Sequence, residues 1–220
     1  MKSISEALLY GIADLGYLSP KHLEHVVEKM IEGGIDVLQL RAKGVSEEQI
    51  ESYARRLAAI TEQAGVPFII NDHPELVPSV GAQGAHVGQE DFEVSDARWR
   101  AGRALASEVA LPLIGKSTHS VDQAHAAVAQ GADYIGFGPL FVTPTKPGRA
   151  AVGLGSIREI QDSISVPVFC IGGIKIENLE TVLEAGARRV VVVSGILQAS
   201  DPAGYCAQVK KALLERNAQG

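Results

Sequence analysis

Two basic side chains and an amide alternate along one short segment of the chain. Gln39, Arg41 and Lys43 are separated by single residues at the end of the apolar run 37–40. Alternate side chains of a β-strand point to the same face, so these three groups would lie together. They could grip a diphosphate through charge-assisted hydrogen bonds. The segment alone leaves open the alternative of an ordinary solvated strand end with flanking charges.

Two carboxylates follow the next two apolar runs of the chain. Asp72 comes just after the run 68–70, and Asp91 follows the run 85–87. Because neighbouring strands would deliver both carboxylates, the pair could bind one hard cation. Mg²⁺ is typically held by a few carboxylate oxygens together with water and substrate phosphate. Either aspartate taken alone is better explained as a helix cap or a turn residue.

The residues around these carboxylates offer further choices. Asn71 directly precedes Asp72 and adds an amide. Glu90 stands beside Asp91 and is an alternative ligand. His86 is interpreted as a core histidine, the more common role for a histidine in an apolar run.

Hydroxyl groups and a lysine follow the fifth and sixth apolar runs. Ser117 would face the same space as Gln39 if the residue before it points outward. His119 is nearby, but no Gly-x-Ser-x-Gly elbow surrounds the serine, which argues against a hydrolase triad. Thr143, Thr145 and Lys146 lie in a long loop that could close over a phosphorylated ligand. The alternative for this loop is a plain surface connection.

Glycines follow the last two apolar runs. Gly172 and Gly173 come after the seventh, and Ser194 and Gly195 after the eighth. In an eight-stranded α/β barrel, loops at these two places commonly bind phosphate through backbone N–H groups. The pattern therefore indicates a phosphate-binding cup without specifying a reaction.

Eight short apolar runs alternate with longer amphipathic segments from end to end. The expected strands cover residues 8–14, 37–40, 68–70, 85–87, 113–116, 134–137, 168–171 and 189–193. Runs this short and continuous are typical of parallel strands covered on both faces. We expect an α/β fold, a single (β/α)8 TIM barrel over residues 1–220 with a frayed tail at 217–220. An open doubly wound sheet is the alternative, but its glycine-rich first turn is missing.

Several helix ends can be predicted from capping residues. Ser46 begins a capping-box pattern, and Gly65 ends the helix that follows it. Ser120 and Asp201 each precede another helical pattern. Residues 72–83 contain two prolines and are too short for a regular crossover helix, so we expect an irregular turn there.

Composition and net charge limit the kinds of partner that the protein is expected to bind. A formal net charge of −6 argues against binding nucleic acid, whose affinity rests on phosphate neutralisation. No run approaches the roughly 18 apolar residues of a transmembrane helix, and no signal peptide is recognisable. We expect a cytoplasmic enzyme acting on small phosphorylated molecules, with no membrane partner and with self-association possible. Cys170 and Cys206 have no metal-ligand spacing and are expected to be reduced and buried.

Seven short segments, in chain order, resemble the thiamine-phosphate synthase family. They are Gln39-Leu40-Arg41-Ala42-Lys43, Ile70-Asn71-Asp72, His86-Val87-Gly88-Gln89-Glu90-Asp91, Ser117-Thr118-His119, Thr143-Pro144-Thr145-Lys146-Pro147, Ile171-Gly172-Gly173-Ile174 and Val193-Ser194. The resemblance implies that hydroxymethylpyrimidine diphosphate is joined to hydroxyethylthiazole phosphate, giving thiamine phosphate and diphosphate.

The resemblance also implies a role for each matched position. Asp72 and Asp91 would hold Mg²⁺, and Arg41, Lys43, Ser117 and Lys146 would be the catalytic residues. The substrate-binding positions would be Gln39, Leu40, Arg41, Ala42, Lys43, Asn71, Ser117, Thr143, Pro144, Thr145, Lys146, Gly173, Val193 and Ser194. Three positions depart from the family pattern: Ala42 replaces a frequent acidic residue, His73 a common arginine and Lys116 a usually apolar residue.

The implied chemistry agrees with these residue types. A thiazole nitrogen has a free lone pair, so the reaction needs a stabilised leaving group rather than a general base. One alternative is an isomerase of the thiazole tautomerase type, which would need an acid/base residue and could dispense with the two aspartates. Another is a non-catalytic regulator that retains the phosphate cup.

Overall fold

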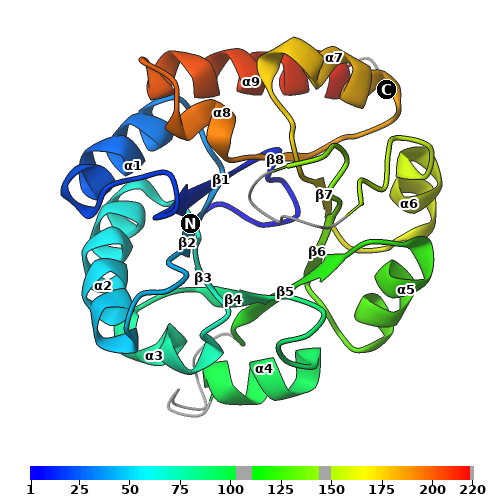
Figure 1. The fold of residues 1–220 in the computed structure, drawn as a ribbon. Helices are drawn as coiled ribbons and strands as arrows, with labels where there is room; N and C mark the ends of the chain where they lie inside the picture. The colour runs from blue at the N-terminus through cyan, green and yellow to red at the C-terminus, as the bar shows by residue number, and fades with distance from the viewer. Residues whose placement is uncertain (103–110, 144–149, 219–220) are drawn as a thin grey trace.

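The computed structural model describes residues 1–102, 111–143 and 150–218, and its strands form a closed barrel (Figure 1). Every strand is parallel to its neighbours, and β1 pairs with β8 to complete the ring. The strands are β1 (Leu9–Asp14), β2 (Val37–Arg41), β3 (Phe68–Asn71), β4 (Gly84–Val87), β5 (Leu113–Thr118), β6 (Tyr134–Phe137), β7 (Val168–Cys170) and β8 (Val190–Val192). The predicted (β/α)8 barrel is confirmed, and the open sheet is excluded.

Helices surround this barrel on the outside (Figure 1). They are α1 (Leu23–Glu32), α2 (Glu47–Ala64), α3 (Val77–Val80), α4 (Val94–Gly102), α5 (Val121–Ala129), α6 (Ile157–Ser163), α7 (Ile176–Glu184), α8 (Ser194–Leu197) and α9 (Pro202–Asn217). Two short 3-10 turns, η1 (Pro20–His22) and η2 (Pro74–Leu76), precede α1 and α3. The pair η2 and α3 is the irregular turn expected between β3 and β4.

Capping groups end the helices where the sequence predicts. The Ser46 hydroxyl accepts a hydrogen bond from the Gln49 amide, and Gly65 ends α2 in the left-handed conformation at φ 65°. The Asp201 carboxylate accepts from the Gly204 amide at 3.0 Å to begin α9. These caps satisfy backbone groups that the helices themselves leave unpaired.

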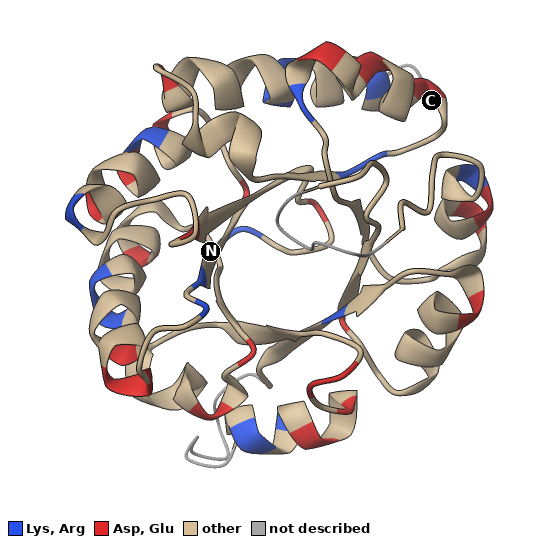
Figure 2. Cartoon of the chain, in the orientation of Figure 1, with Lys and Arg blue, Asp and Glu red and all other residues tan. Residues whose placement is uncertain are grey.

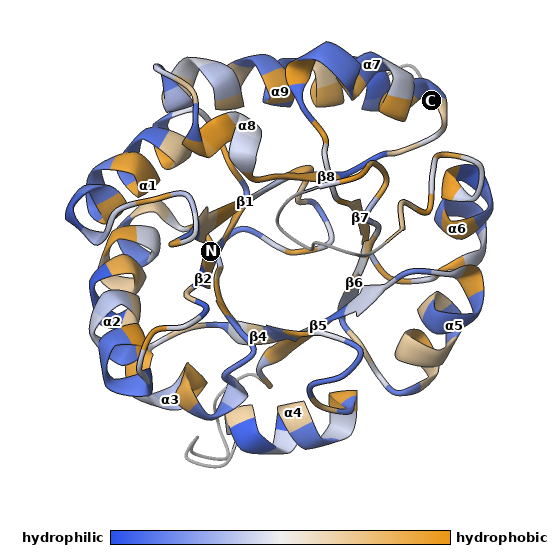
Figure 3. Ribbon diagram, viewed as in Figure 1, coloured by the Kyte–Doolittle hydropathy of each residue, from blue (hydrophilic) through white to orange (hydrophobic). Residues whose placement is uncertain are grey.

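The apolar core has two layers. One fills the barrel and includes Tyr10, Ile69, Tyr134 and Phe169. The other packs the outward faces of the strands against the helices. In Figure 3 the strands carry many hydrophobic residues, whereas the helices alternate between hydrophobic and hydrophilic ones. Alternation along each strand therefore decides which side chains can reach the barrel mouth.

Charged residues gather on the outer helices, with a smaller number on the loops near the barrel opening (Figure 2). Among the helices described, none combines the length and apolar character that crossing a membrane requires. Asn217 is the last residue of α9, and its amide donates to the carbonyl oxygens of Arg188 and Leu213.

Asp36 connects the start of β1 to the last helix. Its carboxylate accepts hydrogen bonds from the Leu8 and Leu9 amides at 2.9 and 3.1 Å. It also pairs with the ammonium groups of Lys2 and Lys210. Burial alone would raise the pKa of Asp36, but these hydrogen bonds outweigh it and leave the pKa below its usual value.

We expect Asp36→Asn to lower the free energy of unfolding by about 1.5–3 kcal/mol at pH 7, because hydrogen bonds to a charged group are lost. A lowered folded-state pKa means that the stabilisation is present above the unfolded value of about 4 and fades as pH falls below it. Urea unfolding at pH 7 and near pH 3.5 should show the difference between wild type and variant shrink. Asp162→Asn, which removes an exposed pair with Arg188, is the control. A difference independent of pH contradicts this assignment.

Candidate active site

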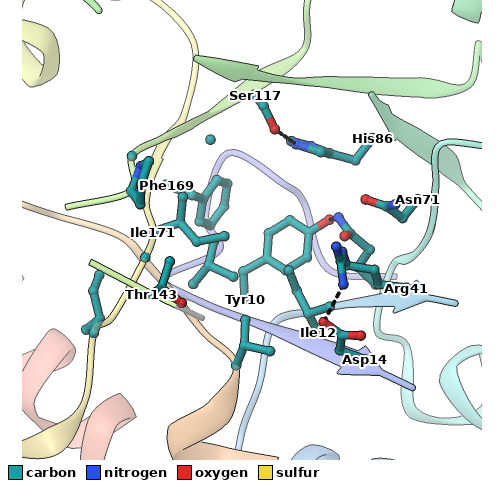
Figure 4. A pocket seen from close by; sticks show the side chains of 18 of the residues that line it. Tyr10, Ile12, Asp14, Arg41, Asn71, His86, Ser117, Thr143, Phe169 and Ile171 are labelled. Carbon is teal, nitrogen blue, oxygen red and sulfur yellow. Dashed lines mark hydrogen bonds and ion pairs between the residues drawn. The ribbon is translucent and has the colours of Figure 1, made fainter. Parts of the chain in front are cut away.

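One pocket lies at the end of the barrel where the strands finish, as in barrel enzymes generally (Figure 4). It brings together side chains from β1 to β8 that are far apart in sequence. Eight of the predicted site residues line it: Gln39, Arg41, Asn71, Ser117, Thr143, Gly173, Val193 and Ser194. The convergence expected from strand ends is therefore present in the structure.

Aromatic rings form the floor of this pocket. The ring centroids of Tyr10 and Tyr134 lie 5.9 Å apart, and Phe169 meets both rings edge-on. The Tyr10 hydroxyl interacts with that of Tyr134 at 3.0 Å and accepts from the Gln39 amide at 2.9 Å. Burial raises the pKa of both tyrosines, so they stay neutral. An uncharged aromatic floor suits a flat heterocycle.

His86 occupies a different place from the one its sequence context suggests. It lines the pocket, where its Nε2 lies 3.0 Å from the Ser117 hydroxyl and its Nδ1 lies 3.3 Å from the Tyr134 hydroxyl. Figure 4 shows the Ser117 and His86 side chains pointing toward one another. The interpretation of His86 as a core histidine is corrected, because its inward position on β4 places it at the mouth.

Arg41 is fixed by a buried partner that the sequence analysis did not identify. Its Nη1 lies 2.7 Å from Oδ2 of Asp14, which is 1% exposed (Figure 4). The other Asp14 oxygen accepts from the Gly16 amide at 2.9 Å. The register places Asp14 opposite Arg41 at the ends of β1 and β2. Because Asp14 fixes the Arg41 guanidinium, this segment is not an ordinary solvated strand end. Lys43, by contrast, remains largely exposed.

The two predicted metal ligands come from adjacent strand ends. Burial raises the pKa of Asp72, the charge of the neighbouring Asp91 raises it further, and Lys43 opposes both. The Lys43 ammonium lies 2.5 Å from Asp72 Oδ2. Asp72 has φ 63°, the one left-handed non-glycine among the described residues, and its amide donates to the His86 carbonyl. Strained conformations of this kind cluster at functional sites.

The donor set suits a hard divalent cation with few protein ligands. Within the described ranges, no group of three or more acidic, histidine or cysteine side chains could enclose a metal. Two close carboxylates on an otherwise open rim match the needs of Mg²⁺, which keeps waters and takes phosphate oxygens. Asp91 and its alternative Glu90 are both exposed, and the Asp91 carboxylate is tied into its loop by the Gly88 amide at 2.7 Å.

Close backbone approach explains the glycines after β7. Gly172 and Gly173 have φ 100° and 70°. A Cβ on Gly173 would lie 2.7 Å from the Cβ of Phe141, and one on Gly172 would lie 2.4 Å from Pro139. The loops after β6 and β7 are thus packed main chain to main chain. Ser194 begins α8 with one residue between it and the end of β8, and it lines the pocket, so the start of this short helix borders the same end of the pocket.

The comparisons with known proteins agree with this geometry. A family model described as thiamine monophosphate synthase matches residues 9–196. The chain belongs to this family. It is 43% identical over 176 residues to a thiamine-phosphate synthase of Thermus thermophilus, covering 80% of this chain and 81% of the relative. It is 38% identical over 213 residues to one from Halalkalibacterium halodurans, covering 96% and 97%.

A solved structure supports the same assignment. Thiamine phosphate pyrophosphorylase from Pyrococcus furiosus superposes with a TM-score of 0.84 at 27% identity, covering 96% of this chain and 98% of the other. The family resemblance that the seven segments carry is therefore confirmed.

Five predicted site residues are not among those that line the pocket: Leu40, Ala42, Lys43, Asp72 and Asp91. Leu40 is 1% exposed and packs in the layer between barrel and helices, and Ala42 packs against the same layer. Only their main chain could serve a ligand in the pocket. Three further positions fall outside the described residues: Pro144, Thr145 and Lys146.

We expect Asp72→Asn to separate function from stability. Asparagine tolerates the left-handed backbone, and removing a carboxyl whose pKa is raised relieves its unfavourable burial beside Asp91. The melting temperature without metal should be equal to or above that of the wild type, whereas turnover with Mg²⁺ should fall by about 100-fold or more. Calorimetry with added chelator and a steady-state assay measure the two. Unchanged turnover in Mg²⁺ would refute the metal assignment.

Proposed function

We propose that this chain joins 4-amino-5-hydroxymethyl-2-methylpyrimidine diphosphate to hydroxyethylthiazole phosphate. A carbon–nitrogen bond forms between the pyrimidine methylene and the thiazole nitrogen, the methylene–oxygen bond breaks, and diphosphate leaves. The observation that carries the proposal is a pocket with an aromatic floor, Arg41 on one side and the glycines after β7 on the other. Lys43, Asp72 and Asp91 lie together at the neighbouring strand ends, outside the pocket lining. Such a pocket can hold a flat ring between two phosphate-binding ends.

The side of the pocket formed by β1 to β4 would bind the diphosphate substrate. Arg41 and Lys43 would neutralise its charge, and Asn71 would donate hydrogen bonds to it. The roles of Asn71 and Lys146 in binding the diphosphate substrate are assigned through the family resemblance. Gln39 is held in place by Tyr10 and would face the ring. The aromatic floor would keep water from the reacting carbon.

Asp72 and Asp91 would hold Mg²⁺ beside that diphosphate. When bound, the ion would supply positive charge to the diphosphate oxygens as the methylene–oxygen bond breaks. The Lys43 ammonium, now paired with Asp72, would stay at the same rim and share the diphosphate charge. Arg41 would act from a fixed position, because Asp14 orients its guanidinium.

The other side of the pocket would bind the thiazole phosphate. The main chain around Gly173 and the first turn of α8 at Ser194 would offer N–H groups to the phosphate oxygens. Thr143 and Val193 line the space between this cup and the aromatic floor. The thiazole nitrogen needs no deprotonation, so a base is not required for attack.

A thiazole isomerase is the alternative function, and His86 gives it one specific support. The imidazole lies in the pocket beside Ser117 and could move protons. The two carboxylates at the rim have no task in such a reaction and favour synthesis instead. Incubating the protein with each thiazole carboxylate phosphate isomer alone would detect an isomerase.

The decisive experiment incubates the purified protein with both substrates and Mg²⁺ and measures thiamine phosphate and diphosphate in equal amounts. Chelation of the metal should abolish both products. Absence of thiamine phosphate while the pyrimidine diphosphate is consumed would contradict the proposed synthesis.

We further propose that the protein works in the cytoplasm with reduced thiols. Cys170 and Cys206 are both buried, and burial raises each pKa to about 12. Both thiols therefore stay protonated and unreactive at neutral pH.

We expect Gly173→Ala to weaken binding of the thiazole phosphate selectively. A Cβ would collide with Phe141 and strain the left-handed backbone, so the amides of the cup would move. The Michaelis constant for the thiazole phosphate should rise about 10-fold or more, and that for the pyrimidine diphosphate should change little. Gly44→Ala is the control, because it has a similar positive φ but open space around its Cβ. Equal losses for both substrates would point to a collapsed barrel mouth.

A further inference from the structure

Lys116 is a charged residue in a largely apolar layer. It lies within β5, where its neighbours Ile114 and Thr118 on the same face are completely buried. The whole residue is 4% exposed. Burying an ammonium costs several kcal/mol unless hydrogen bonds and charges compensate it. The side chain therefore needs specific partners.

Those partners belong to the loop between β4 and α4. The Lys116 ammonium donates to the carbonyl oxygen of Gly88 at 2.9 Å and to that of Phe92 at 2.6 Å. The register already places Lys116 opposite Val87, the last residue of β4. One side chain thus ties both ends of the loop 88–92 to β5.

In the sequence, Asp91 lies between Gly88 and Phe92, the two residues whose carbonyl groups accept hydrogen bonds from Lys116. The Asp91 carboxylate accepts from the Gly88 amide at 2.7 Å, and its own amide donates to the Gly88 carbonyl. Gly88 therefore contacts both Asp91 and Lys116. A Cβ on Gly88 would lie 2.6 Å from Asp91 Oδ2, so the turn has little room to rearrange.

A second hydrogen bond ties the same loop to β5. The Gln89 side-chain amide donates to the carbonyl oxygen of Ser117, the residue after Lys116. Ser117 itself faces the pocket. The carboxylate loop and the serine are therefore held in one fixed arrangement by adjacent residues of β5.

We propose that Lys116 is a positioning residue for the metal site: its ammonium fixes the loop that presents Asp91 toward Asp72. The inference rests on the proposed role of those two carboxylates. Asp91 and Glu93 supply the negative charge facing the ammonium, and the ammonium in turn offsets the gathering of acidic groups at this rim. Partners of this kind around metal ligands typically change metal affinity by 10–100-fold when removed.

The test compares Lys116→Met with Lys29→Met. Methionine keeps the length and apolar stem but removes the charge and donors. Lys29 pairs with the exposed Glu32 on α1, so its variant removes the same charge away from the site. Electron paramagnetic resonance of free Mn²⁺, with inorganic diphosphate present, measures metal affinity without any turnover.

We expect Lys116→Met to weaken Mn²⁺ binding by about 10-fold or more, with Lys29→Met unchanged. In the steady-state assay, the Mg²⁺ concentration for half-maximal rate should rise in parallel, while the Michaelis constant for the thiazole phosphate stays constant. In an Asp91→Asn background, the further substitution Lys116→Met should have little effect on Mn²⁺ affinity. Equal affinities in Lys116→Met and Lys29→Met, or full additivity with Asp91→Asn, overturn the proposal.

One further variant and the results for the wild-type protein distinguish the possible outcomes. If Lys116→Met does not fold, Lys116→Gln retains a donor on a shorter stem and should weaken Mn²⁺ binding in the same direction, and unchanged binding counts against the proposal. If the wild-type protein forms thiamine phosphate and binds Mn²⁺ but Lys116 variants match the control, only the positioning role fails. If the wild-type protein binds no Mn²⁺, the proposed metal site itself fails.

Discussion

Closure of the parallel barrel is the constraint from which the site follows. β1 pairs with β8 as well as with β2, and each pair of neighbouring strands is parallel, so all eight strands run in one direction around a closed ring. Their carboxyl ends then meet at a single rim, so side chains from the ends of different strands can face a shared space. Gln39, Tyr10 and Tyr134 form one hydrogen-bonded chain across the barrel only because of that closure. The family's chemistry depends on residues that the sequence keeps far apart.

Charge at this rim is arranged in compensating contacts rather than in isolated groups. Asp14 is almost fully buried and pairs with Arg41, and Lys43 pairs with Asp72. Buried charges are costly when a partner is missing, so each contact both lowers that cost and fixes an orientation. A phosphorylated substrate would thus meet groups already in position, which reduces the ordering required on binding.

The sequence predicted the strands to within two residues because short apolar runs between capped helices have few other interpretations. It also identified Gln39 and Arg41 as facing the same way, since alternation within a strand needs no partner. It did not identify Asp14 as the partner of Arg41, because that contact depends on the register between β1 and β2. His86 was misplaced for a different reason: an apolar run does not say which alternate residues face the barrel interior. Leu40 was misplaced in the other direction: it lies inside the family motif, but its side chain faces the helices and not the pocket.

Asp72 shows where the fold accepts a local cost for the site. A left-handed backbone at a residue with a side chain costs of order 1 kcal/mol or more, and here a carboxyl group is also held beside Asp91. The amide of Asp72 donates to the His86 carbonyl, which holds this conformation through β4. β4 also leads into the loop that carries Asp91. The hydrogen bond from the Asp72 amide to the His86 carbonyl therefore also sets the separation between the Asp72 and Asp91 carboxylates. The barrel therefore positions the two aspartates, and the energetic penalty of their proximity is met by folding.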